Sequence, residues 1–290
     1  MSAAVAPFLL ERDFELNSLG RALAAAVAGM GSVVSIVGPA GIGKSSLIEA
    51  ARGKALERGL TWLSASGTES ETRYPFGVVR QLFERHLRGL NAQTRSEALD
   101  GVATSTAALL AEGTPGGTDG PDAAYTVIHG LYWLTANLAQ RGALVLAIDD
   151  MHWGDRASRD FVIYLSRRIA ELPVLVITAS RPGADEGGAL NQSDEVRFNH
   201  SLTLSPAALS ESAVTRLVAR RFPDRDVAPL AMACHRATAG NPFFCNVLMG
   251  ELGDEPTDSR DASRLVEETS RAAADLIVRK LHGLSPTAAA

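Results

Sequence analysis

The sequence predicts an α/β fold in which a parallel sheet is covered by helices on both faces and is followed by a smaller, all-helical part. Three observations lead to this prediction. Short apolar runs alternate along the chain with segments of helical periodicity. Several of these runs are apolar throughout, which is typical of strands buried on both faces of a parallel sheet. From residue 206 onward, only helical patterns occur.

The expected strands and helices follow one another in regular order. Strands are expected at residues 32–37, 60–65, 143–148, 173–179 and 200–204. Helices are expected at residues 13–28, 44–57, 76–90, 122–140 and 155–169. Asp155 is expected to be the N-cap of the last of these helices. Glycine and polar residues dominate 113–121 and 182–195, which are expected to be loops. We therefore expect a core at residues 1–205 and a helical part at residues 206–290, which we call the lid.

Residues 38–45 carry the most specific motif of the chain. They read Gly-Pro-Ala-Gly-Ile-Gly-Lys-Ser and fit the phosphate-binding loop pattern G-x-x-x-x-G-K-[ST] at every fixed position. An expected strand precedes the motif and an expected helix follows it, as the pattern requires. Glycines let successive N–H groups turn toward an anion, and the helix N-terminus adds further donors. The alternative is a tight Gly/Pro turn between strand and helix that binds no ligand.

Each part of the motif has a chemical task. Lys44 would bring positive charge to the β- and γ-phosphates, and the Ser45 hydroxyl would ligate Mg²⁺. Arginine could not replace Lys44 without changing the geometry, because its planar guanidinium is not a compact ammonium. The residues expected to contact the nucleotide are Gly38, Pro39, Ala40, Gly41, Ile42, Gly43, Lys44, Ser45 and Ser46.

Charged residues follow two of the other expected strands. Asp149 and Asp150 come directly after the run at 143–148, and Arg181 follows the run at 173–179. The carboxyl ends of parallel strands meet at the sheet edge where a phosphate-binding loop also lies. Asp149 would ligate Mg²⁺, Asp150 would act as general base on water, and Arg181 would contact the γ-phosphate. A simple turn for the two carboxylates and a solvated loop arginine are the alternatives.

Composition narrows the function classes. The net charge of −5 over 290 residues argues against nucleic-acid binding by this segment itself. No apolar run is long enough to span a bilayer, and the first residues lack the pattern of a signal peptide. Cys234 and Cys245 have neither metal-site spacing nor a disulfide framework and are expected to be reduced. A cytoplasmic protein without a membrane partner is expected.

Several segments together resemble one family. Residues 9–15 (Leu-Leu-Glu-Arg-Asp-Phe-Glu) resemble a motif of two apolar residues followed by Gly-Arg-Glu, with Glu11 in place of glycine. Residues 148–155 (Ile-Asp-Asp-Met-His-Trp-Gly-Asp) are similar to an Asp-Asp-X-His-Trp-Ala-Asp signature. Residues 179–182 (Ala-Ser-Arg-Pro) resemble the end of a sensor strand. The remaining matches are Leu-Ser-Pro at 204–206, without the glycine often found there, and Gly-Asn-Pro-Phe-Phe at 240–244.

These motifs resemble the nucleotide-binding module of the signal-transduction ATPases with numerous domains (STAND), closest to the large ATP-binding LuxR-family regulators related to the maltose regulator. The resemblance covers about residues 8–285. It implies a P-loop NTPase fold of the AAA+ or STAND type, with a five-stranded parallel sheet in the order 5-1-4-3-2 and a small helical lid. It also implies that Arg12 and Pro206 lie near the adenine and ribose.

The resemblance carries functional expectations as well. ATP or ADP and Mg²⁺ would be the ligands, hydrolysis would be slow and regulatory, and an unidentified effector would bias the switch. DNA would be bound only through a C-terminal domain outside this chain, and a winged-helix domain would follow the lid. Nucleotide-dependent self-association is left open. The alternatives are a turnover ATPase or small-molecule kinase, and the same module fused to a protein kinase or a nucleotide cyclase.

Overall fold

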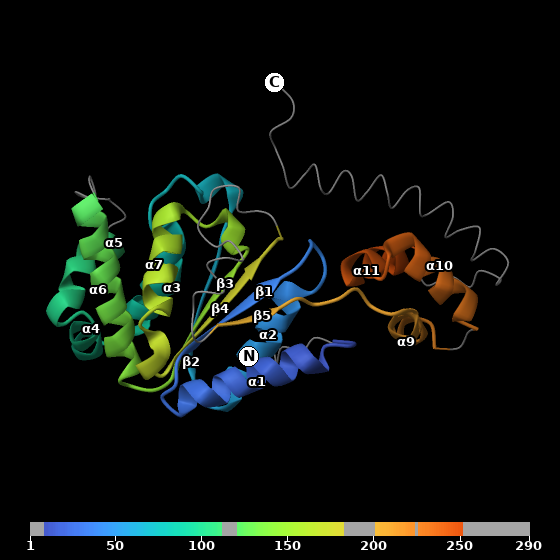
Figure 1. Ribbon diagram of the computed structural model, residues 1–290, viewed down its shortest axis with the longest axis horizontal. Coiled ribbons are helices and arrows are strands. Elements are labelled where there is room, and N and C mark those ends of the chain that lie inside the picture. Colours follow the sequence, from blue (N-terminus) through green and yellow to red (C-terminus); the bar gives the residue numbers. More distant parts are fainter. Residues whose placement is uncertain (1–8, 112–120, 183–200, 224–225, 252–290) are drawn as a thin grey trace, which may run out of the picture. The chain divides into compact units, whose positions relative to one another are not determined.

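The computed structural model describes residues 9–111, 121–182, 201–223 and 226–251 (Figure 1). These residues form two compact units. The first contains Asp13–Pro39 and Lys44–Ser205, and the second contains Leu9–Arg12, Ala40–Gly43 and the described residues after Ser205. Of the two predicted loops, residues 113–120 and 183–195 lie outside the described residues, whereas Pro121 begins a helix.

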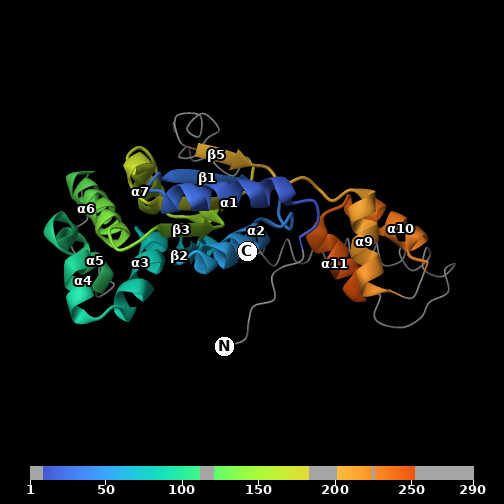
Figure 2. The same cartoon turned by 90° about the horizontal axis from the view of Figure 1, so that it is seen from below.

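A five-stranded sheet forms the centre of the first unit. Its strands are β1 (Ser32–Val37), β2 (Thr61–Ser66), β3 (Leu144–Asp149), β4 (Val174–Ser180) and β5 (Ser201–Leu204). All pairings are parallel, and the order is β2-β3-β4-β1-β5. Figure 2 labels β5, β1, β3 and β2, which follow one another across the sheet in this sense. This order confirms the one that the resemblance implied. It also confirms the parallel sheet predicted from the apolar runs, because β3 and β4 are buried along almost their whole length.

Helices cover both faces of this sheet. Five of them were predicted, and nearly all of their ends lie within one residue of the predicted ends. They are α1 (Asp13–Val27), α2 (Lys44–Glu57), α3 (Gly77–Gly89), α6 (Pro121–Ala139) and α7 (Arg156–Ser166). The last of these ends three residues early, and a 3₁₀ turn, η4 (Ile169–Glu171), follows it. No helix within the described ranges is long and apolar enough to cross a bilayer.

Alternation along the strands assigns the two faces. Leu144, Leu146 and Ile148 of β3 belong to a large apolar cluster with side chains from α3, α6 and α7. The intervening Val145 and Ala147 are equally buried but lie outside that cluster. Helices α1 and α2 contact the sheet instead from the other face (Figure 1). The apolar side chains on both faces explain why these strands read as unbroken apolar runs.

Short helices between α3 and α6 were not predicted. They are α4 (Ala92–Ala98), η2 (Gly101–Thr106) and α5 (Ala107–Ala111). Asn91 begins α4 with a side-chain cap on the amide of Thr94, at 2.8 Å. Both α4 and η2 pack against α6. Helices this short depend on such tertiary contacts, because their intrinsic stability in water is low. One or two turns also give too little hydrophobic periodicity for a prediction from the sequence.

The second unit has its own apolar core. Its described helices are α9 (Glu211–Arg221), α10 (Ala228–Thr238) and α11 (Pro242–Glu251). Apolar side chains from all three helices, together with Leu10, are buried in one cluster. Cys234 and Cys245 lie in this cluster with both thiols free.

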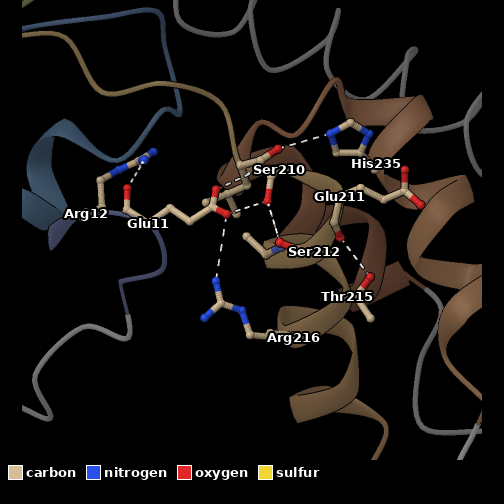
Figure 3. A network of polar contacts seen from close by, with 10 residues as sticks. Glu11, Arg12, Ser210, Glu211, Ser212, Thr215, Arg216 and His235 are labelled. Carbon is tan, nitrogen blue, oxygen red and sulfur yellow. Dashed lines mark hydrogen bonds and ion pairs between the residues drawn. The ribbon is translucent and has the colours of Figure 1, made fainter. Parts of the chain in front are cut away.

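Glu11 ties the N-terminal segment of the second unit to the start of α9 (Figure 3). Its carboxylate accepts hydrogen bonds from the Ser210 amide, at 2.9 Å, and from the Ser210 hydroxyl, and it lies 3.9 Å from Arg216. The backbone of Glu11 has φ = 55°, in the left-handed region that favours glycine. This conformation explains why the family motif Gly-Arg-Glu has glycine at this position. In this chain, the hydrogen bonds from Ser210 offset the backbone strain of a glutamate there.

Replacing Glu11 with glutamine is expected to lower the Tm at neutral pH, by an amount that shrinks as the pH falls below 4.5. The hydroxyl and amide of Ser210 hold the pKa of the Glu11 carboxyl below its usual 4.5. A carboxylate with a lowered pKa in the folded state stabilises above its unfolded pKa, and this contribution disappears as the pH falls through the folded pKa. Tm values of wild type, E11Q and the neighbouring control E211Q across this range check the prediction. A difference that stays constant with pH contradicts it.

Candidate functional site

The phosphate-binding loop runs from the end of β1 into the first turn of α2, as the motif predicted. Gly41 and Gly43 adopt φ values of 77° and 104°, which only glycine adopts readily. The amide of Gly38 donates to the carbonyl of Ser180 at the end of β4, at 3.2 Å. Ser45 lies exposed and Ser46 half-buried in the first turn of α2. The loop therefore begins tied to the adjacent strand and ends at a helix N-terminus, where anions are favoured.

Lys44 is the buried cation of this site. Its Nζ donates to the carbonyl oxygens of Gly38, at 2.8 Å, and Pro39, at 3.0 Å, and the side chain is only 7% exposed. Burial lowers the pKa of Lys44, Arg181 lowers it slightly further, and the carboxylates of Asp150 and Asp149 act in the opposite direction. A desolvated ammonium held by its own loop is ready to interact with phosphate oxygens.

The two aspartates lie at the carboxyl end of β3. Asp149 ends the strand; its carbonyl accepts from the amide of Gly67, at 3.0 Å, and its carboxylate accepts from the amide of Asp150, at 2.9 Å. Asp150 has φ = 45°, in the left-handed region that few residues other than glycine, asparagine and aspartate adopt. A Cβ on Gly67 would come within 2.4 Å of the Asp150 carbonyl, so the close approach of β2 to this turn requires glycine. Burial raises the pKa of Asp150, and the charge of Asp149 raises it further.

Arg181 and His152 complete the cluster of polar side chains at this site. Arg181 follows β4 half-buried and interacts electrostatically with Lys44, Asp150 and His152. His152 is buried, with its Nδ1 3.8 Å from Asp150 Oδ1, and neither ring nitrogen has a hydrogen-bond partner within the described structure. Burial, with smaller contributions from Arg181 and Lys44, lowers the pKa of His152 to about 4, so this imidazole is neutral at neutral pH.

The structure thus brings four of the predicted residues together. Lys44, Asp149, Asp150 and Arg181 come from three neighbouring strand ends and influence one another electrostatically. His152 belongs to the same cluster. The sequence offered a signal for it, because it stands two residues after Asp150, but periodicity alone could not separate a site residue from a packed one.

Asp155 holds this turn in place. Its buried carboxylate accepts from the amides of Ser158 and Phe76, both at 2.8 Å, and from that of Val78, at 3.4 Å. It also accepts from the Ser158 hydroxyl, at 2.6 Å. Asp155 is therefore the N-cap of α7, as predicted, and it also fixes the beginning of α3. Removing a partner from a buried amide costs about 1–3 kcal/mol, so this carboxylate contributes substantially to the geometry beside Asp150.

The residues present fit Mg²⁺ with a nucleotide. Ser45 offers an exposed hydroxyl and Asp149 a half-buried carboxylate, which are hard oxygen ligands. In the described ranges, no three His, Cys, Asp or Glu side chains gather into a metal cluster. Mg²⁺ is commonly held by one or two protein oxygens together with phosphate oxygens and water, which is what Ser45 and Asp149 can offer beside a nucleotide. The space around Gly43 is open, as a phosphate would require.

The predicted adenine-side residues lie in the second unit. Arg12 is buried, and its guanidinium donates to the carbonyl oxygens of Ile42, at 3.1 Å, Ala207, at 2.7 Å, and Glu11, at 3.0 Å. Pro206 is also buried, in the segment that leads to α9. The sequence analysis did not include Asn241 among the residues expected at the site. Asn241 in fact donates from Nδ2 to the carbonyl of Ala40, at 2.9 Å, a contact with the phosphate-binding loop itself.

Comparison with known proteins gives a consistent picture. Residues 9–177 match the family model described as an AAA ATPase domain. An uncharacterized protein from Rhizobium meliloti (strain 1021) is 31% identical over an alignment of 264 positions, which covers 81% of this chain and 24% of the relative. The chain therefore spans about a quarter of the length of this curated relative.

Solved structures share the fold at low sequence identity. A Walker-type ATPase from Pyrococcus abyssi is 13% identical with a TM-score of 0.57, covering 96% of this chain and 77% of the other. The ORC2 protein of Aeropyrum pernix, solved in ADPNP–ADP complexes, is 17% identical with a TM-score of 0.53, covering 91% and 69%. These likenesses concern the fold alone.

Proposed function

Because the chain belongs to the AAA ATPase domain family and has the ATP-binding P-loop NTPase fold, we propose that it is a nucleotide-operated switch: the ATP- and ADP-binding module of a LuxR-family transcriptional regulator of the STAND class. The observation that carries the proposal is the cluster of Lys44, Asp149, Asp150 and Arg181 at one edge of the sheet. It contains a cation for phosphate, a metal ligand, a base and a second cation.

Each residue has a defined task in this proposal. The ammonium of Lys44 attracts the β- and γ-phosphates, and the guanidinium of Arg181 distinguishes ATP from ADP by contact with the γ-phosphate. Ser45 and Asp149 hold Mg²⁺, which neutralises phosphate charge when bound. Asp150, with its raised pKa, accepts a proton from the attacking water at its carboxylate. Residues 1–205 act as the nucleotide-binding core and residues 206–290 as the lid.

The regulatory part of the proposal rests on two further observations. The lid signature at residues 240–244 resembles that of the LuxR-family modules. The curated relative is about four times longer than the segment matched, which leaves room for sensor and output domains. In this proposal the module works in the cytoplasm, DNA is bound by another domain of the full regulator, and an effector shifts the balance between the ATP and ADP states. ATP-dependent self-association would be the outcome of activation.

Two measurements on the purified protein test the proposal. We expect it to retain ADP, identified by extraction and chromatography, because a resting switch holds its product. We also expect Mg²⁺-dependent ATP hydrolysis below about 1 s⁻¹, the lower end of ordinary enzyme turnover. Faster steady-state hydrolysis without an effector would instead indicate a turnover ATPase or a small-molecule kinase. A purified protein that retains no adenine nucleotide and binds neither ADP nor ATP when they are added overturns the proposal.

A further inference from the structure

The carbonyl oxygens of the phosphate-binding loop are held one after another along its length. Lys44 holds those of Gly38 and Pro39 within the first unit. The next three are held by groups of the second unit, to which residues 40–43 also belong. Asn241 Nδ2 donates to Ala40, the Phe243 amide donates to Gly41 at 3.2 Å, and Arg12 Nη2 donates to Ile42.

Asn241 is the centre of this arrangement, because it has two tasks at once. Its Oδ1 accepts from the amides of Phe243, at 3.1 Å, and Phe244, at 3.5 Å, and so caps the N-terminus of α11. Its Nδ2 faces the other way and holds the Ala40 carbonyl at 2.9 Å. The same side chain therefore joins the start of a helix to the phosphate-binding loop.

Gly41 permits this close contact. A Cβ at Gly41 would lie 2.7 Å from the Cβ of Phe243 and 2.8 Å from Oδ1 of Asn241. Both distances are below ordinary van der Waals contact, and φ at Gly41 is 77°. The phosphate-loop pattern leaves this position unrestricted, so the motif itself does not demand a glycine here. The contact with α11 does.

The direction of the loop amides follows from these contacts. A trans peptide is planar, so its C=O and N–H point in opposite directions. Holding the carbonyls of Ala40 and Gly41 therefore turns the amides of Gly41 and Ile42 away from Asn241 and the start of α11. In the same way, holding the carbonyl of Ile42 turns the amide of Gly43 away from Arg12. Inward-pointing amides are what a phosphate-binding loop offers to its ligand.

We infer that Asn241 and Arg12 are positioning residues of the phosphate-binding loop, which aim its amides at the phosphates of the nucleotide by holding its carbonyls from the opposite side. This inference rests on the proposed function, because it names what makes that site competent for phosphates. It assigns the guanidinium of Arg12 to the loop backbone. It also gives the Gly-Asn-Pro-Phe-Phe segment a task beyond the capping of α11.

Replacing Asn241 with serine tests the inference, because serine caps a helix well but is too short to reach Ala40. We expect ADP and ATP to bind about three- to tenfold more weakly, the effect of one hydrogen bond, while the affinity for adenosine stays unchanged. The matched control is N91S, which changes another capping asparagine that contacts its own helix α4. It should leave both affinities as in wild type. Titration calorimetry with ADP, ATP and adenosine provides the comparison.

A second variant guards against loss of folding. G41A should weaken ADP binding as well, because the added Cβ displaces Asn241 and Phe243. The double variant G41A/N241S should bind ADP no more weakly than G41A alone, because both substitutions break the same contact. Equal ADP affinity of wild type and N241S, or parallel losses of ADP and adenosine, overturns the inference while leaving the proposed function intact. A wild type that binds neither ADP nor ATP overturns the proposed function instead.

Discussion

Replacing Lys44 with alanine is expected to remove most of the thermal stabilisation that ADP and ATP give to the wild-type protein. The Lys44 ammonium is buried in the loop beside Asp149, Asp150 and Arg181, so it is placed to neutralise phosphate charge. A ligand present at about a thousand times its Kd stabilises a folded protein by about 4 kcal/mol. Loss of the cation that interacts with the phosphates should remove most of this ligand-induced stabilisation. The measurement is the Tm of wild type and K44A with and without ADP or ATP.

The matched control for this experiment is Lys54→Ala. Lys54 lies on the same helix and donates to the carbonyl of Leu16, at 3.2 Å, away from the loop. Its replacement can lower the Tm of the free protein but should leave the shift caused by ADP as large as in wild type. If ADP raised the Tm of K44A as much as that of wild type, or if both variants lost the ADP-induced Tm shift equally, Lys44 would not be the residue that holds the phosphates.

Replacing Asp150 with asparagine is expected to reduce ATP hydrolysis by about a hundredfold or more, the usual contribution of a general base, without weakening ATP binding. Burial and the neighbouring Asp149 raise the pKa of the Asp150 carboxyl, which makes it a better proton acceptor than an exposed aspartate. Asparagine keeps the size of the side chain but cannot take a proton. Removing a negative charge near the phosphates should, if anything, tighten binding.

Single-turnover hydrolysis with the protein in excess of ATP is the appropriate measurement, because it separates the chemical step from product release. Asp160→Asn provides the control: this aspartate lies on α7 at the surface, 3.8 Å from Arg156. It should hydrolyse ATP at the wild-type rate. Wild-type hydrolysis by D150N would exclude Asp150 as the base, and a parallel loss of ATP binding would indicate that it acts on the nucleotide rather than on water.

The local features of this protein could be predicted because they depend on neighbouring residues. The loop at residues 38–45, the buried strands beside it and the cap at Asp155 each follow from a short pattern, and all three are present. The strand order was not contained in those patterns. It came from the resemblance to known modules, since period and composition do not say which strands pair.

Asp155 makes one contact that a local sequence pattern predicts and one that it does not. Its capping bond to Ser158 spans three residues and could be predicted, whereas its bond to the Phe76 amide joins positions 79 residues apart. Phe76 itself takes a left-handed φ of 61°, which no sequence pattern indicated. Only the packing of α3 against α7 brings these groups together.

By itself, the sequence determined the fold class and the chemistry of the phosphate-binding loop, because a glycine-rich turn between strand and helix is specified by adjacent residues. The tertiary structure decided how that loop is held. Asn241 lies 201 residues from Ala40, and Arg12 lies 30 residues from Ile42, yet both donate to loop carbonyls. A hydrogen bond to a backbone carbonyl leaves no trace in the identity of the accepting residue, so these contacts could be found only in three dimensions.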